Sequence, residues 1–474
     1  MGPKFPALAK AGGLAALGLV LAVVPSSADG ERALTRHQSQ AELNGRLSTE
    51  ALSDLIAHGE HLFKARFTEA DGVGRPFATQ AVVPTKRTRP QEQTFQRLSG
   101  LDAGTCATCH RDPIIGGSGD FALNAFVVDG VVRPDFDTTN PELSNERNTN
   151  HLFGAGLVEL LAREMTRDLQ ALRANALADA RINNEAVSTA LITKGVSFGR
   201  LTAEPDGFVD LTAVEGVDPD LIVRPFGQKG VVASLRQFTI NALNQHHGMQ
   251  ADERFGPRWV GEVDFDGDGI EVEITRGDIS ALVAWQATRP PPTRELQQVN
   301  ADRGAVEQGS RLFNDLGCAT CHRRALPLDS TLFEDPASFD SAAALRAGDA
   351  AGAATYDLAG LDGIAKLGRD AQGRLMVPLF GDLKRHRMSD GTVIALANER
   401  LSQRFVDHDV FQTAELWGVG STAPYGHRGD FPTLDGIIRA HGGDARSSRD
   451  AYAEQNQSAR QAIIRFLKTL VIEP

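Results

Sequence analysis

The pentapeptide Cys-Ala-Thr-Cys-His occurs twice in this 474-residue chain, at positions 106–110 and 318–322. The chain has no cysteines outside these two motifs, so none is left for a structural disulfide. Two thiols at this spacing can bond the two vinyl groups of one porphyrin, and the histidine that follows can bind its iron. The motifs therefore predict two covalently attached haems c, held by Cys106, Cys109, His110, Cys318, Cys321 and His322.

Two other readings of Cys-x-x-Cys pairs fit less well. A zinc site needs the pairs close together, whereas 212 residues separate Cys106 from Cys318. A redox-active dithiol does not require the histidine that follows each pair here.

The repeat extends upstream of the cysteines. Gly59-x-x-Leu62-Phe63 precedes the first motif, and Gly309-x-x-Leu312-Phe313 precedes the second. Because the length also exceeds what one core usually serves, we expect a mainly α fold of two cytochrome c-like domains with long irregular loops. The predicted divisions are 1–28, a signal peptide; 29–58, a flexible N-terminal extension; 59–287, the first haem domain with insertions; 288–300, a linker; and 301–474, the second haem domain.

The first residues are typical of an export signal. Lys4 and Lys10 are followed by an apolar run over 11–24 and by small residues ending at Ala28. The run is shorter than the roughly 20 residues of a membrane-spanning helix, so removal is favoured over a permanent anchor and a periplasmic protein with no membrane span is expected. Loss of the two lysines would change the net charge from −12 to −14, which disfavours a nucleic-acid partner and suits a basic one, although many exported proteins are acidic for solubility alone.

Apolar residues at helical spacing predict helices in 151–193, 231–249, 279–285 and 460–471, with Pro290-Pro291-Pro292 ending the third. Between the second and third, Asp264, Asp266 and Asp268 alternate in a Gly-containing turn that is similar to the first half of an EF-hand calcium loop. Thr275 stands where that loop has its last Glu, although Glu271 and Glu273 are near. A solvated acidic turn is the alternative to calcium.

Taken in order, several further motifs resemble the di-haem oxidoreductase family, relatives of bacterial di-haem cytochrome c peroxidase. Besides the haem motifs, they span most of 55–470 and comprise Gly116-Gly117-Ser118-Gly119, His151-Leu152-Phe153-Gly154, Arg224-Pro225-Phe226-Gly227, the acidic turn, Leu416 to Tyr425, His427-Arg428-Gly429 and His441-Gly442-Gly443-Asp444.

The resemblance implies that the C-terminal haem is six-coordinate and receives electrons. His441 falls at the family position of its second axial ligand, where the close peroxidases have Met. An imidazole there should lower the reduction potential. Met388 is the rival ligand. Asn148, Thr422 and Pro424 fall where the relatives hold a calcium ion between the haems, and a local structural role is the alternative.

For the N-terminal haem, which meets hydrogen peroxide in the relatives, the candidates for a distal ligand are His151, His246 and His247. His151 and Glu159 are the catalytic candidates, with Glu159 as general acid or base. An ordinary polar role is the alternative for each. The relatives also carry a Trp soon after the position of Asn148, whereas the first Trp here is Trp259.

Trp285 and Trp417 are the replacement candidates for an electron relay, and core packing is the alternative for both. Gln228 stands where the family usually has Trp. The expected function is a peroxidase-like oxidoreductase that takes electrons from a small donor such as a cytochrome c or cupredoxin and reduces hydrogen peroxide or another small oxidant. A non-catalytic electron-transfer cytochrome and a di-haem oxidase or oxygenase with another substrate are the rivals.

Overall fold

The computed structural model describes residues 32–74, 104–120, 146–294, 300–337, 352–399 and 403–473, and the short strands at 77–78, 87–88 and 123–124. The predicted signal peptide lies outside these residues. The longer helices are α1 (Thr49–Lys64), α3 (Ala155–Asn183), α4 (Leu235–Ala242), α7 (Arg276–Ala287), α9 (Arg303–Asp315), α10 (Leu434–Ala440), α11 (Arg446–Glu454) and α12 (Gln457–Lys468). One-turn helices are α2 (Cys106–Cys109), α5 (Asp252–Phe255) and α6 (Pro257–Val260).

Short strands pair into several small sheets, so the fold is mixed α/β, with 39% helix and 16% strand, rather than mainly α as expected. Segments between the helices pair as short strands because buried backbone N–H and C=O groups need hydrogen-bond partners. One sheet has the order β1 (Gly45–Arg46), β12 (Ala354–Asp357), β11 (Leu332–Asp335), and another has the order β6 (Val187–Thr193), β7 (Val196–Ala203), β8 (Val209–Asp210).

The other sheets of the described residues have two strands each. They are β10 (Leu326–Leu328) with β13 (Leu375–Val377), β14 (Arg385–Arg387) with β15 (Val410–Gln412), β9 (Thr293–Arg294) with β16 (Leu470–Val471), β2 (Phe77–Ala78) with β3 (Arg87–Thr88), and β4 (Leu123–Asn124) with β5 (Glu146–Arg147). Each of these pairs is antiparallel.

Two helix crossings have the same construction in the two halves of the chain. Helix α1 packs on α7, and helix α9 packs on α12. A Cβ atom on Gly59 would overlap the carbonyl oxygen of Ala281, and one on Gly309 would overlap that of Ala462. The glycine of each repeated Gly-x-x-Leu-Phe motif therefore lets two helix backbones touch.

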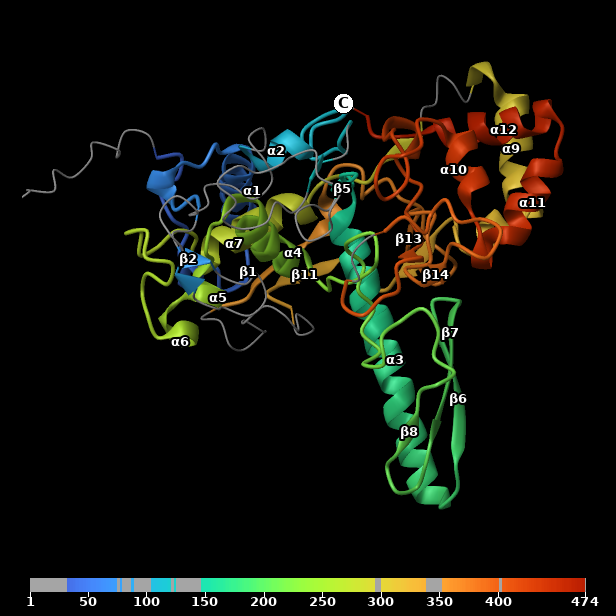
Figure 1. Ribbon diagram of the computed structural model, residues 1–474. Coiled ribbons are helices and arrows are strands. Elements are labelled where there is room, and N and C mark those ends of the chain that lie inside the picture. The colour runs from blue at the N-terminus through green and yellow to red at the C-terminus, as the bar shows by residue number, and fades with distance from the viewer. Residues whose placement is uncertain are drawn as a thin grey trace, which may run out of the picture.

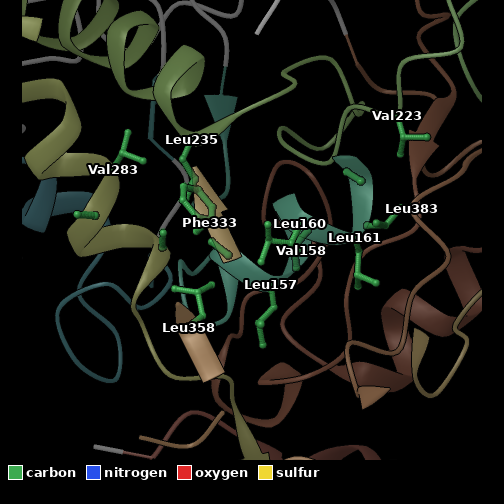
Figure 2. Close-up of a cluster of buried hydrophobic side chains, with 14 of the residues drawn as sticks. Leu157, Val158, Leu160, Leu161, Val223, Leu235, Val283, Phe333, Leu358 and Leu383 are labelled. Carbon is green, nitrogen blue, oxygen red and sulfur yellow. The ribbon is translucent and has the colours of Figure 1, made fainter. Parts of the chain in front are cut away.

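The buried core does not divide at the expected linker. Leu157 and Leu161 of α3 belong to the same cluster as Phe333, Leu358 and other residues of 326–383 (Figure 2). A second cluster lies around Phe313 and Phe466. Segments from the predicted second domain thus contribute to the core of the first half, and the division into two cytochrome c domains remains a prediction.

Helix α3 ends earlier than the periodicity predicted. Asn184 adopts a left-handed conformation after Asn183, and residues 187–193 form β6. The β-branched side chains of Val187, Thr189 and Ile192 favour a strand over a helix. The C-terminal half of α3 and the β6–β7–β8 sheet together project from the body as an arm (Figure 1).

The described part of the predicted N-terminal extension is hydrogen bonded to the rest of the chain. Asp71 accepts hydrogen bonds from the backbone of Ala33 and Leu34, and Asp278 accepts one from Gln38. Helix α1 begins at Thr49, with Ser48 as its N-cap, ten residues before the predicted domain start. Among the described residues, none of the helices is both long and apolar enough to span a membrane.

We predict opposite effects of two glycine substitutions in α9. Gly309→Ala adds a methyl group against the rigid backbone of α12, and overpacking of this kind costs about 1–3 kcal/mol. Gly304→Ala meets no atom within 4 Å and should only gain helix propensity, up to about 1 kcal/mol. Denaturant unfolding of both haem-loaded variants measures this, and equal stabilities would contradict the close crossing.

Candidate haem sites

Each Cys-x-x-Cys-His motif folds into a single tight turn. The first forms α2, and the second begins with the 3-10 turn η6 (Cys318–Thr320). The backbone N–H of His110 donates to the carbonyl of Cys106, and that of His322 donates to Cys318. All four cysteines are free thiols. The two thiols and the imidazole of each motif are therefore displayed together on one turn, as a covalently attached haem requires.

The first motif is backed by aromatic side chains. The ring centroids of Phe63 and His110 lie 5.8 Å apart, and Phe63 lies 4.2 Å from Trp285. The second motif repeats this arrangement, with Phe313 at 6.4 Å from His322 and at 5.6 Å from Phe466. The phenylalanine of each repeated sequence motif thus packs beside the histidine of the Cys-x-x-Cys-His motif that follows it.

In the second site, His322 and His441 lie together. Their ring centroids are 6.5 Å apart. An iron bound by two imidazole nitrogens, each at about 2 Å, needs close to this separation. His322 shares a hydrogen bond through Nδ1 with the carbonyl of Phe380, at 3.2 Å, and His441 does the same with Ile437, at 2.8 Å. These bonds favour the tautomer in which Nε2 is unprotonated and able to bind a metal.

The rival ligand Met388 packs near Leu396, Phe411 and Ala440. Its carbonyl accepts from the backbone of Gly442, next to His441. The segment that carries Met388 therefore helps to place His441, and the paired imidazoles favour His441 as the second ligand.

Sequence reasoning missed a pair beside the second motif. His386 lies 2.9 Å from a carboxylate oxygen of Asp382 and 4.0 Å from the sulfur of Cys321. Ligand atoms of these three residues are close enough to hold a metal, but a thioether to haem would occupy the Cys321 sulfur. Asp382 and His386, four residues apart, follow no pattern that distinguishes them in sequence.

Two of the three distal candidates of the first site are electrostatic neighbours of His110. Burial, with smaller contributions from His246 and His151, lowers the pKa of His110 to about 4, although backbone hydrogen bonds oppose the shift. Burial likewise lowers the pKa of His246 to about 4. His246 belongs to a π-helical segment, η5 (Leu243–His247), a local irregularity that is frequent at functional sites.

His151 and His247 have other contacts. Nε2 of His151 lies 3.0 Å from the carbonyl oxygen of Trp417, and the ring of His247 meets the edge of Phe67 at 5.9 Å. The structure therefore places His246 and His151 near the first motif. The hydrogen bond of His151 to Trp417 links it to the second half of the chain.

Glu159 is buried inside α3 rather than exposed on it. It forms an ion pair with Arg163 and accepts a hydrogen bond from the backbone of Leu235 at 2.8 Å. Burial raises its pKa, although Arg163 opposes the shift. Since both oxygens have partners, this geometry favours a structural role over the predicted acid–base role.

Trp417 contacts residues near both sites. A Cβ atom on Gly154 would touch its ring, and its carbonyl contacts His151. Its backbone N–H donates to Leu379, the neighbour of Phe380, which binds His322. Trp285 instead belongs to the first site, where Arg289 stacks on its ring at 4.5 Å.

The residues predicted to hold a calcium ion between the haems are partly brought together. The side-chain amide of Asn148 donates to the carbonyl of Pro424 at 2.5 Å, and its backbone N–H donates to His427. Gln228, which replaces the family Trp, donates to the Asn148 carbonyl at 2.8 Å. Thr422 follows the turn η8 (Val419–Ser421), two residues before Pro424.

The comparisons with known proteins agree with this picture over part of the chain. Residues 352–470 match the model of the family described as "Di-haem oxidoreductase, putative peroxidase". The predicted resemblance is thereby confirmed over residues 352–470, which are similar to the di-haem oxidoreductase family. This match supports haem cofactors and an oxidoreductase activity.

Solved structures give only distant likenesses. Hydrazine synthase of Kuenenia stuttgartiensis, studied under xenon pressure, is 14% identical with a TM-score of 0.35, covering 99% of this chain and 100% of its own. A MauG-like protein associated with microbial copper homeostasis is 14% identical with a TM-score of 0.27, covering 57% of this chain and 78% of its own. Neither score establishes a common fold. No curated protein matches the chain.

The buried histidine beside Asn148 predicts acid destabilisation. Burial lowers the pKa of His427 to about 4, below the value of about 6.5 expected when unfolded. The unfolded chain therefore binds more protons between these values, so the contribution is complete above pH 6.5 and is lost as pH falls toward 4. His427→Gln should flatten the dependence of unfolding free energy on pH by up to about 1 kcal/mol per unit. The exposed control His408→Gln should not.

Proposed function

We propose that this chain is an exported di-haem c-type enzyme that accepts electrons at its C-terminal haem and reduces hydrogen peroxide at its N-terminal haem. The observation that carries the proposal is the difference between the two motifs. His322 has a second imidazole, His441, at a separation that suits a six-coordinate iron. His110 instead has two histidines in its neighbourhood, one of them hydrogen bonded elsewhere.

Cys106 and Cys109 would bind one haem through thioethers, and Cys318 and Cys321 the other. His110 and His322 would be the proximal ligands. The two haems would supply one-electron transfer and peroxide reduction, and the remaining chemistry belongs to the side chains of the chain.

In the C-terminal site, the polypeptide fixes the ligands. Phe380 and Ile437 hold the two imidazoles through their Nδ1 atoms. Two neutral imidazoles favour a low potential relative to a Met ligand, which suits a site that passes electrons onward rather than storing them.

In the N-terminal site, we assign the proton-transfer role to His246. Burial keeps this imidazole neutral at pH 7, because its pKa is lowered to about 4. A neutral imidazole can accept a proton from bound peroxide and return it to the departing oxygen. His151, the earlier catalytic candidate, is assigned to positioning, since it bonds the Trp417 carbonyl.

Trp417 is the side chain best placed to lie on the electron path. It contacts Gly154 in the first half and is bonded through Leu379 to the segment that holds His322. For the electron donor we propose a small basic redox protein, such as a cytochrome c or cupredoxin, because the chain is strongly acidic. The periplasm is the proposed location.

A non-catalytic electron-transfer cytochrome is the second candidate. It is favoured by the same His246, since a buried neutral imidazole near His110 can also serve as a sixth ligand. In that case both irons would be six-coordinate and neither would bind peroxide.

Spectroscopy separates the two functions. We expect electron paramagnetic and optical spectra of the haem-loaded protein, oxidised and half-reduced, to show one low-spin iron and one iron that responds to hydrogen peroxide. His246→Gln should slow the peroxide reaction at least tenfold, as for loss of a general acid–base group. Two low-spin irons that ignore peroxide in both states would replace the enzyme with the electron-transfer protein.

The ligand assignment has its own test. His441→Ala should convert the low-spin C-terminal iron to high spin, because the separation of 6.5 Å leaves this imidazole as the partner of His322. Met388→Leu, a matched change of an apolar side chain, should leave the spectrum unchanged. The opposite pattern would identify Met388 as the ligand, and near-ultraviolet circular dichroism checks that both variants are folded.

A further inference from the structure

The acidic turn at 264–268 gathers its carboxylates. Ligand oxygens of Asp264, Asp266 and Asp268 all lie within 4.8 Å of one another. The turn is shaped by Asp264, whose two oxygens accept hydrogen bonds from the backbone of Gly267 and Gly269. Three oxygens at such separations can all contact one cation whose bonds are about 2.4 Å long.

Asp266 is the member of this cluster that points to a ligand. Its side chain is 1% exposed, and in the described part of the chain neither carboxylate oxygen has a hydrogen-bond donor. Burial of an unpartnered carboxylate is costly unless a positive charge compensates it. The two neighbouring aspartates make this cost larger rather than smaller.

A further carboxylate, that of Glu273, is electrostatically coupled to the three aspartates. It is buried, and the backbone N–H of Gln250 donates to one of its oxygens at 2.7 Å. Burial and repulsion from the aspartates raise its pKa well above the usual range and raise that of Asp266 to about 8 and that of Asp268 to about 6. Glu271, in contrast, is exposed and takes no part.

We propose that Asp264, Asp266, Asp268 and Glu273 bind one calcium ion. Calcium matches a donor set made only of carboxylate oxygens on a flexible turn, whereas zinc and copper prefer nitrogen or sulfur ligands. Glu273, at the tenth position, takes the place of the Glu that an EF-hand carries at the twelfth, where Thr275 instead caps helix α7.

The ion would stabilise the contact between residues 250–252, which follow His246, and residues 273–274, which precede α7. Glu273 binds the Gln250 backbone, and Ile274 accepts a hydrogen bond from Asp252 at 3.0 Å. Helix α7 in turn carries Trp285 against Phe63 at the first haem motif. Calcium would therefore be structural and would fix the segment that follows His246 relative to the helix behind the first haem motif. The binding itself does not depend on the proposed peroxidase activity.

The test is titration calorimetry with calcium chloride on the haem-loaded, full-length protein after removal of divalent ions with EGTA. The wild type should bind one equivalent more than Asp266→Asn. Asp210→Asn, a matched change at the end of strand β8 on the arm, should bind as the wild type does. All three proteins keep Asn148, so an ion bound there cancels in the comparison. Equal stoichiometry in wild type and Asp266→Asn would overturn the proposal.

A second measurement covers the case in which Asp266→Asn does not fold. In the wild type, hydrogen exchange of peptides from 264–274 and 248–252 should slow at least tenfold when calcium is added to the stripped protein. Peptides from β6 and β7 serve as the internal control. Unchanged exchange in 264–274 on calcium addition would rule out the site, whatever the peroxidase activity of the protein.

Discussion

The close crossing of two helix pairs is the constraint on which both haem motifs depend. Helix α1 can meet α7, and α9 can meet α12, only because Gly59 and Gly309 have no side chain at the contact. The crossing sets the direction in which each following phenylalanine points, and Phe63 and Phe313 then pack beside His110 and His322. Each Cys-x-x-Cys-His turn is backed by this packing rather than by a disulfide, since none of the four cysteines is bonded to another.

Buried ion pairs connect the two halves of the chain. Arg236 lies almost fully buried and pairs with Glu253 and, at 2.8 Å, with Asp335, which joins α4 to the β11 strand from the second half of the chain. Breaking such a pair would leave an uncompensated charge in the interior, so these contacts specify how the halves fit together. This explains why residues 326–383 share a core with α3 (Figure 2), although in sequence they follow the second haem motif.

The sequence predicted the parts of the molecule that rest on local chemistry. The turns at the two Cys-x-x-Cys-His motifs, the paired Gly-x-x-Leu-Phe helices and the resemblance over 352–470 could all be predicted from short motifs. What could not be read depends on distant contacts. Residues 187–193 continue an apolar periodicity but form a strand, because β7 offers it a partner. The docking of residues 33–38 depends on Asp71 and Asp278, and the burial of Glu159 depends on Arg163 and Leu235.

Identical pentapeptides need not give identical haem environments, because the motif fixes only the proximal side. Beyond the second motif, the short helix α10 ends at His441 and presents one imidazole opposite His322, with both Nδ1 atoms bonded to carbonyls. Beyond the first motif, the π-helical segment η5 changes the direction of the side chains that follow α4. His246 of this segment lies near His110. A regular α-helix through 243–247 would place His246 at a different angle. The different surroundings of His110 and His322 therefore originate in how two unrelated segments approach turns of identical sequence.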